Sequence, residues 1–407
     1  MSNSLDRTSP NKLLSPFGYF TAFYLYQAVA TPLLQLLFID QLDSSVYRFT
    51  SFKVTLLLSF IYYISVFLGV TASPKFGQTA FNKLIYLLSL KNKNIRSQNM
   101  RSCSLLFFLL FIFSFLFLAK VSGAGTLWIL DSRKAYQLYR NGVGVFYAVT
   151  ATLLTLSYTS SLFAFSRLTA NLMIRFGLKT LFYMFAAYFL GSKALILGIA
   201  VIGVVYFNYN IKRVRSVWIF SVAILLVLST SLLQLSQGTA QNLLDTLFYA
   251  NYFSTTDKFI SLFDENFNFL FGKVFFSNFW SYVPRIIYPD KPYEYGILLV
   301  HKVLFPGAAA QSFTPGILPW AGAFLDLSLP GVILGGLAHG LLLGWVHNYY
   351  LKSRHSVVDF MVLVKVGGFP ALFMYFPTPM FVFLILPVLS ITVVITTNIV
   401  LSSRLRA

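Results

Sequence analysis

Long apolar runs, most of them about 20 residues long, alternate with short polar segments along the chain. A helix needs a run of this length to cross the hydrocarbon core of a bilayer. The pattern predicts an all-α polytopic membrane protein with about ten transmembrane helices, at residues 17–38, 54–72, 103–121, 145–165, 180–191, 194–208, 217–235, 331–350, 358–375 and 380–401. No repeat or low-complexity linker interrupts the pattern, so residues 1–407 are expected to form a single membrane domain.

Two connecting segments are much longer than the others, and they cover residues 122–144 and 236–315. In the second segment we expect surface helices at 242–252 and 256–263. Residues 314–326 are expected to dip back into the edge of the bilayer. The span that follows carries glycines at positions 331, 335, 336, 340 and 344, which predicts close packing against a neighbouring helix.

The apolar run from 180 to 207 allows two interpretations. It is broken only at Gly191-Ser192-Lys193, and it is short for two spans of ordinary length. Basic residues flank both of its ends, however, and both flanks then prefer the cytoplasmic side. This favours a hairpin of two short helices that turns at Gly191, with Lys193 near the outer surface. A single tilted helix would invert the sidedness of everything that follows it.

Charge supports the membrane assignment and sets the orientation. The chain is 57% hydrophobic and only 11% charged, with a net charge of +19, whereas soluble domains carry about 25% charged residues. More than half of the 31 lysines and arginines lie in the connectors 1–16, 73–102, 166–179, 209–216, 351–357 and 402–407. By the positive-inside rule these connectors face the cytoplasm, and the two long segments face the periplasm. The positive charge therefore predicts contact with membrane lipids and not with nucleic acid.

Other features of composition narrow the class further. A single cysteine, Cys103, excludes an internal disulfide and a thiolate metal cluster. The first sixteen residues are polar, so no removable signal peptide is expected. The histidines His301, His339, His347 and His355 are scattered, and no carboxylate completes a ligand set at helical spacing. We therefore expect no metal site and no cofactor.

The most strongly punctuated stretch covers residues 280–296 and contains Pro284, Pro289 and Pro292. Proline fixes φ and removes a backbone donor, so a regular helix is excluded here. The same stretch holds four charged residues and four tyrosines, which are Arg285, Asp290, Lys291, Glu294, Tyr282, Tyr288, Tyr293 and Tyr295. A rigid, aromatic and charged loop held by membrane helices is expected to contact a ligand, although a solvated connector without chemistry stays open.

Cations on the predicted outer side lie in three separate segments, and they are Arg133, Lys134, Arg140, Lys193, Arg285 and Lys291. Arginine binds phosphate bidentately, and a fixed pair of arginines can hold a pyrophosphate as it leaves. The aromatic residues among these cations suit the apolar faces of sugar rings. Lipid-paired interfacial cations and an interfacial aromatic belt are the alternatives that the residues leave open.

Three of these features occur together in one known family. Residues 283–296 resemble its proline-punctuated loop, Gly191-Ser192-Lys193 resembles its Gly-Ser-Arg turn between two membrane helices, and residues 314–331 resemble its run into a glycine-rich span. The spacings Arg133…Gly144 and Arg285…Gly296 also fit. Over roughly residues 120 to 350, the chain resembles the oligosaccharide repeat-unit (O-antigen) polymerases of bacterial envelopes, often called Wzy, and more distantly the O-antigen ligases.

The resemblance implies a fold similar to the C-type (GT-C) membrane glycosyltransferases and a metal-independent glycosyl transfer. The growing glycan would move from undecaprenyl pyrophosphate to the next lipid-linked repeat unit, with pyrophosphate leaving, on the periplasmic side of the inner membrane. The implied partners are undecaprenyl-pyrophosphate-linked oligosaccharides, with a chain-length regulator as an open addition. Two other functions stay open, which are an O-antigen ligase that transfers glycan to the lipid A core and a polytopic transporter. Among charges inside the spans, which transport would require, only Lys365 is clear.

In this chemistry we expect Arg285 and Arg133 to hold the donor pyrophosphate, and Asp290 or Glu294 to accept the proton of the acceptor hydroxyl. The further residues expected to bind substrate are Arg140, Lys193, Lys291, Tyr288, Tyr293 and His301, of which His301 is also a reserve candidate for the base. Lys193 departs from the arginine of the family, and a lysine lacks the bidentate fork.

Overall fold

A computed structural model describes residues 10–30, 49–88, 97–139, 143–164, 170–221, 268–283, 288–292, 294–304, 319–353 and 357–367. Every regular element within these ranges is helical, which confirms the predicted all-α class. The α-helices are α1 (Pro16–Tyr24), α3 (Phe49–Ala72), α4 (Gln78–Leu88), α5 (Ser97–Val121), α6 (Leu127–Leu130), α7 (Ser132–Tyr139), α8 (Gly144–Phe163), α9 (Ala170–Tyr188), α10 (Lys193–Tyr206), α14 (Lys273–Ser277), α15 (Ile297–Leu304), α16 (Pro319–Lys352) and α17 (Val357–Val366). Shorter or wider helical turns cover Lys12–Leu14, Leu25–Ala30, Phe207–Ile211 and Asn278–Tyr282.

Four helical segments in the described part are long and apolar enough to cross a membrane, and they are Val54–Ala72, Met100–Val121, Ala194–Ile211 and Pro319–Lys352. They overlap four of the predicted spans, and the last begins twelve residues before the predicted 331. The total of ten stays a prediction, because the span at 380–401 and most of that at 217–235 lie outside the described residues.

Helix α8 matches the predicted span at 145–165 but carries many polar side chains. Its buried hydroxyl residues are Thr150, Thr155, Ser157, Thr159, Ser160 and Ser161. The Ser157 hydroxyl donates to the carbonyl of Ser104 on α5 at 2.7 Å, and the Ser104 hydroxyl donates back to the Ser157 carbonyl at 2.9 Å. Such reciprocal bonds hold helices together where lipid offers no polar partner. The polar residues of α8 therefore mark a helix in the interior of the bundle.

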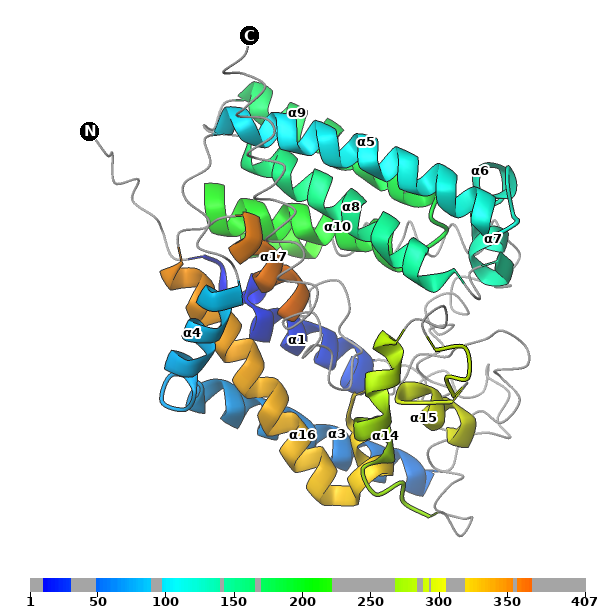
Figure 1. Cartoon of the computed structure of the whole chain (residues 1–407). Coiled ribbons are helices and arrows are strands. Elements are labelled where there is room, and N and C mark those ends of the chain that lie inside the picture. Colours follow the sequence, from blue (N-terminus) through cyan, green and yellow to red (C-terminus); the bar gives the residue numbers. More distant parts are fainter. Residues whose placement is uncertain are drawn as a thin grey trace.

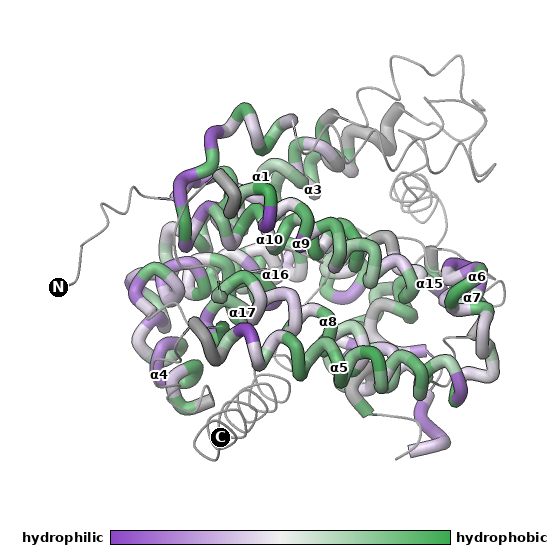
Figure 2. The backbone as a smooth tube through the Cα atoms, turned by 90° about the horizontal axis from the view of Figure 1, so that it is seen from above, coloured by the Kyte–Doolittle hydropathy of each residue, from purple (hydrophilic) through white to green (hydrophobic). Residues whose placement is uncertain are grey.

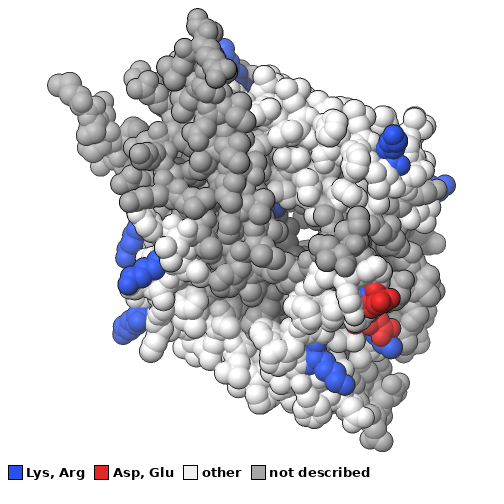
Figure 3. Space-filling model, in the orientation of Figure 1, with Lys and Arg blue, Asp and Glu red and all other residues white. Residues whose placement is uncertain are grey.

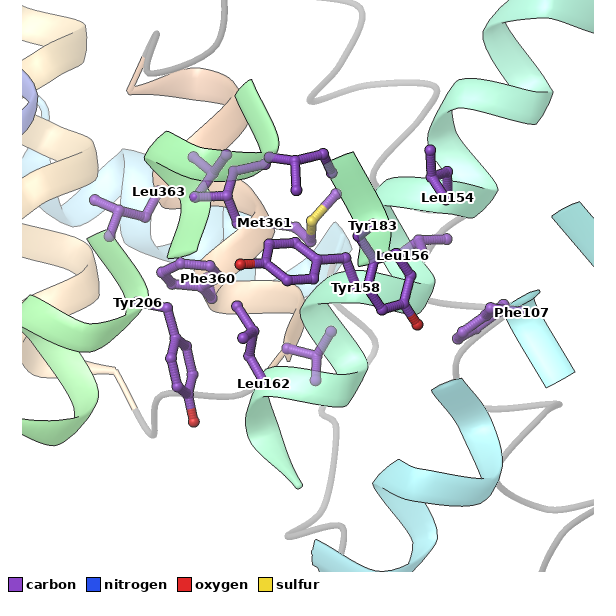
Figure 4. Packing of buried hydrophobic residues seen from close by; sticks show 14 of the residues in the cluster. Phe107, Leu154, Leu156, Tyr158, Leu162, Tyr183, Tyr206, Phe360, Met361 and Leu363 are labelled. Carbon is purple, nitrogen blue, oxygen red and sulfur yellow. The ribbon is translucent and has the colours of Figure 1, made fainter. Parts of the chain in front are cut away.

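The helices form two groups with separate apolar cores, which Figure 1 shows one above the other. The upper group contains α5, α8, α9 and α10, and the lower group contains α1, α3, α14, α15 and the first part of α16. Helix α17 belongs to the core of the upper group and packs against α8 and α16. Apart from Asp359 and Lys365 its residues are apolar, and nearly all of them are buried, as expected for a helix that other helices surround. Figure 4 shows Phe360 and Met361 of α17 beside Tyr158, Leu162 and Tyr206 of the upper group.

The glycines of α16 let it pack closely against α3, as the sequence predicts. A Cβ atom on Gly340 would lie 2.0 Å from the carbonyl oxygen of Val66, and one on Gly336 would lie 2.6 Å from the Ser65 side chain. Gly69 of α3 meets α16 in the same way, since its Cβ would lie 2.4 Å from the Leu337 carbonyl. The two helix backbones therefore touch along a shared stripe of small residues.

The hairpin predicted around Gly191 is confirmed, because α9 and α10 are separate helices that pack against each other. Gly191 has a φ of +65°, in the left-handed region that favours glycine. The predicted start of the first helix was wrong. Helix α9 begins at Ala170, ten residues before the predicted 180, and it includes Arg175 and Lys179. Long basic side chains can extend from a helix toward water, so a charge near the end of a span does not end the helix.

Residues 319–326 are helical and continue into the glycine-rich span, from which the sequence analysis separated them. Helix α16 starts at Pro319 and contains a kink at Leu327 and Ser328, where the Ser328 φ is +56°. Pro330 accounts for the kink because it lacks the N–H that would bond the carbonyl four residues earlier. Trp320, Ala321 and Leu325 of the first part are buried in the lower core.

The polar segments gather at two opposite ends of the helices, and Figure 2 shows hydrophobic residues between them. At one end, the Asn11 backbone donates to Asn208, and the Asn11 side chain donates to the Val214 carbonyl. These contacts join segments that the charge pattern places on one side of the membrane.

The same end of the molecule also holds α4, which the sequence analysis did not predict. It is amphipathic, with Phe81 and Ile85 buried and Lys83 exposed.

Candidate active site

Helices α6 and α7 form the described part of the first long outer segment. The Trp128 indole is buried and donates to the Ser122 hydroxyl at 2.9 Å, which fixes α6 against the end of α5. The Asp131 carboxylate accepts from the Lys134 backbone N–H at 3.0 Å and so caps the start of α7. Arg133 and Tyr136 therefore lie on the short helix α7, while Arg140 lies outside the described residues.

Arg133 contacts the turn between α9 and α10. Its Nη1 donates to the carbonyl of Gly191 at 3.3 Å, and its guanidinium lies 5.6 Å from the centre of the Tyr136 ring. A Cβ on Gly191 would lie 2.1 Å from the Ser132 carbonyl, so only a glycine lets the turn approach α7 this closely. The structure thus brings together two of the three cation-bearing segments, because Lys193 begins α10 just after this turn.

The loop at 278–296, which is the part of the second long segment that carries Arg285, is closed at its base. The Gly296 N–H donates to the Ser277 hydroxyl at 2.9 Å. Gly296 has a φ of +52°, and a Cβ there would lie 2.4 Å from the Asn278 amide oxygen. The left-handed conformation and the close approach both require glycine at this position.

Two further contacts tie the loop across its middle. The Lys291 side chain is 7% exposed, and its ammonium donates to the Val283 carbonyl at 3.0 Å and lies 4.3 Å from the centre of the Tyr295 ring. The rings of Trp280 and Tyr288 stack with centres 5.3 Å apart. These contacts hold together the two sides of the proline-rich stretch. Lys291 therefore has a structural role in the loop, and its expected contact with substrate stays a prediction.

The two candidate base carboxylates are both exposed. Asp290 lies in the turn after Tyr288. Glu294 accepts from the ammonium of Lys302 on α15 at 2.6 Å, in an ion pair whose side chains are both exposed.

The structure leaves several expected site residues without a described side chain. Arg285, Arg140 and Tyr293 lie outside the described residues, as do the expected surface helices at 242–252 and 256–263. Lys193 and His301 are placed by their backbones only, at the start of α10 and within α15. Their contributions to the site stay predictions.

The described parts of the two long segments lie at the same end of the molecule. Figures 1 and 2 both show α6 and α7 at the end where α15 lies, opposite α4. Figure 3 shows lysines and arginines spread over this view of the molecule, with acidic residues beside cations at its right side. Arg133 and the loop at 278–296 therefore share an end, which a common phosphate site requires.

Among the described residues, no three His, Cys, Asp or Glu side chains lie together as they would in a metal site. One carboxylate with a clear structural function was missed as a site residue, although its motif was noted. Asp326 is fully buried and accepts from the backbone N–H groups of Val274 and Phe275 at 3.0 and 2.9 Å. An acid followed by Ser328 and Pro330 within an apolar helix was the available signal.

Two curated relatives, both called O-antigen polymerase, come from Salmonella typhimurium strain LT2 and from Salmonella typhi. Each is 26% identical to this chain over 251 residues, which are 60% of this chain. The matched part likewise spans 60% of the length of each relative. No family model and no solved structure matches the chain. The relatives confirm the resemblance to O-antigen polymerases that the motifs predict.

Proposed function

We propose that the chain is an O-antigen polymerase, a glycosyltransferase of the bacterial inner membrane that joins lipid-linked oligosaccharide repeat units into a surface polysaccharide. The similarity to the two Salmonella polymerases supports the activity. The single observation that carries the site is the placement of Arg133, the Gly191 turn and the loop at 278–296 at one end of the helices. This end is proposed to face the periplasm, opposite the predicted basic connectors.

In the proposed reaction, the donor is a glycan on undecaprenyl pyrophosphate and the acceptor is a hydroxyl of the next lipid-linked repeat unit. The hydroxyl oxygen forms a bond to the anomeric carbon, and the bond from that carbon to the pyrophosphate oxygen breaks. The electron pair of that bond leaves with the pyrophosphate. Arg285 and Arg133, with Arg140 and Lys193, would stabilise the negative charge that develops there.

Arg133 is suited to this role because its position is fixed. One N–H donates to the Gly191 carbonyl, and an arginine has five N–H donors in a rigid fork. The bond to the turn therefore orients the fork and leaves other donors for phosphate. A lysine at 193 can add charge nearby without bidentate geometry.

The stacked rings of Trp280 and Tyr288 are proposed to contact the sugars. Tyr288 is 44% exposed and Phe279 beside Trp280 is exposed as well. Flat aromatic faces next to charged groups match a sugar ring, which has apolar C–H faces and polar edges. Tyr293 and His301 would extend this contact.

Replacement of the candidate bases is expected to separate their roles. Glu294→Gln should lower the polymerisation rate by about 100-fold if Glu294 accepts the hydroxyl proton, since general-base catalysis contributes about 10²–10⁴-fold. Asp290→Asn then serves as the comparison on the same loop and should have a small effect. The rate of polymer growth is measured with purified protein and lipid-linked repeat units. Near-normal rates for both variants would remove both carboxylates from the mechanism.

Deletion of the gene tests the proposed function against the ligase alternative. A cell without its polymerase is expected to carry single repeat units on the lipid A core, and the native chain should restore long polysaccharide. A cell without its ligase would instead accumulate polymer on the lipid carrier. Gel separation of lipopolysaccharide and of carrier-linked glycans measures both. Carrier-linked polymer in the deletion strain would contradict the proposal.

A further inference from the structure

We infer that Asp326 is a positioning residue that sets the placement of the Arg285 loop relative to Arg133. The inference rests on the proposed function for the importance of that placement. The placement itself can be tested without any activity. Asp326 lies outside the loop, in α16, and acts through backbone contacts of α14, which immediately precedes the loop.

The Asp326 carboxylate supplies a cap that α14 lacks in its own sequence. The residue before α14 is Gly272, which has no side-chain oxygen to accept from the first N–H groups of the helix. The two carboxylate oxygens of Asp326 accept from the next two residues instead, with Oδ1 bonded to Val274 N–H and Oδ2 bonded to Phe275 N–H. Both oxygens of one buried carboxylate are thus used to hold one short helix.

The backbone around Asp326 is shaped for the same contact. Pro330 has no N–H to bond the Asp326 carbonyl, so the normal helical bond is lost at this point. That carbonyl accepts from the Gly272 N–H at 3.4 Å, and the Leu325 carbonyl accepts from the Leu270 N–H at 3.0 Å. The kink at Ser328 therefore turns backbone acceptors, together with the carboxylate, toward the segment that enters α14.

Hydrogen bonds carry this placement from α14 into the loop. Ser277, the last residue of α14, accepts from the Gly296 N–H, which ends the loop. Lys291 then joins the far side of the loop to Val283. A continuous set of contacts thus runs from Asp326 in α16 to the described residues on both sides of the stretch that contains Arg285.

A distance measurement tests the inference directly. Spin labels are attached to Lys134→Cys on α7 and Phe276→Cys on α14, both exposed, while Cys103 is buried and stays in place. Pulsed electron resonance on the protein in lipid nanodiscs gives the distribution of distances between the labels. Asp326→Asn keeps one acceptor oxygen but presents an amide NH₂ to a backbone N–H. It is therefore expected to broaden the distribution and shift it, and Asp326→Ala should do so more strongly.

The matched control is Asp359→Asn. Asp359 is also a buried carboxylate, it lies in α17, and it accepts from the Tyr349 hydroxyl at 2.5 Å. Its replacement makes the same change to a buried carboxyl group away from the loop and should leave the distribution unchanged. An unchanged distribution in both Asp326 variants, or equal broadening in the Asp359 control, would overturn the inference. If Asp326→Ala does not fold, Asp326→Asn still decides the question.

An activity measurement adds a second criterion. If Asp326 acts through Arg285, Asp326→Asn should lower polymerisation about tenfold in the native chain and much less in an Arg285→Lys chain, because coupled residues are not additive. Equal losses in both backgrounds would show an independent structural role and would contradict the inference. The label distances remain valid if the reaction is not polymerisation, so failure of the proposed function and failure of this inference give different results.

Discussion

Replacing Arg285 by alanine is expected to lower the polymerisation rate by about 100-fold or more, because a fixed donor to developing negative charge contributes on the order of 10²–10³-fold. Arg285→Lys should recover only a small part of the loss, since lysine keeps the charge but lacks the bidentate fork. The length distribution of surface polysaccharide is measured in a deletion strain that carries each variant at matched protein level. Single repeat units on the core are the expected product of both variants.

The expectation follows from the fixed frame around Arg285. Val283 and Tyr288, which flank residues 284–287, are held by the Lys291 ammonium and the Trp280 ring. Because both flanks are held, we expect the Arg285 guanidinium to lose less conformational freedom on binding a diphosphate than it would in an open loop, so its contribution to the transition state can be large. Arg133→Ala should have a similar effect and should also loosen the contact with the Gly191 turn.

The control for both arginines is Arg175→Ala. Arg175 is exposed on α9 near the helix end that the charge pattern places in the cytoplasm, so its removal changes net charge equally without touching the site. Long polysaccharide at normal levels in both Arg285 variants would remove the diphosphate clamp from the mechanism. A loss as large in Arg175→Ala would show that the effect comes from insertion or net charge.

The positions of helices could be predicted where a single physical signal dominates. Apolar length located α3, α5 and the main part of α16, and the basic flanks of the run at 180–207 resolved the hairpin. The signal failed where a helix continues past its apolar part. Helix α9 extends through Arg175, because a basic side chain near the end of a span does not interrupt the backbone hydrogen bonds. Residues 319–326 form a separate helical part before the kink at Leu327 and Ser328, and the sequence analysis did not join this part to the span at 331–350. Helix α4 was missed because it is amphipathic and, with 11 residues, too short to cross the membrane.

The candidate site could be predicted at the level of segments but not of contacts. Sidedness placed Arg133, the Gly191 turn and the loop at 278–296 on one side of the membrane. In the structure Arg133 contacts the turn, and the described parts of the loop lie at the same end of the helices, while the shared site stays a prediction. The ties of the loop could not be predicted, because they join residues that only the tertiary structure brings together. Asp326 and Val274 are 52 positions apart, and no periodicity relates them. A lysine in a charged loop reads as solvent-facing until packing shows that Lys291 is buried.

The close packing of α3 and α16 provides the largest expected effect on stability. Gly340→Ala adds one methyl group at a point where the Cβ would lie 2.0 Å from the Val66 carbonyl oxygen and 2.9 Å from the Val66 Cα. Neither is the end of a flexible side chain, so the two helices must move apart. Overpacking typically costs about 1–3 kcal/mol, and contact along the rest of the stripe, including Gly336 and Gly69, would be lost as well.

The matched control makes the same chemical change on a helix with space for it. A Cβ on Gly177 of α9 would have no heavy atom within 4 Å, so Gly177→Ala should gain up to about 1 kcal/mol from helix propensity. Thermal unfolding in detergent is monitored by size-exclusion chromatography of heated samples. The midpoint temperature of unfolding is expected to be lower for Gly340→Ala and equal or higher for Gly177→Ala. Equal midpoints would mean that the backbones are not in contact.

Because α16 carries both this stripe and Asp326, separation of α3 from α16 should also disturb the loop. Gly340→Ala should therefore lower polymerisation even in the fraction that stays folded.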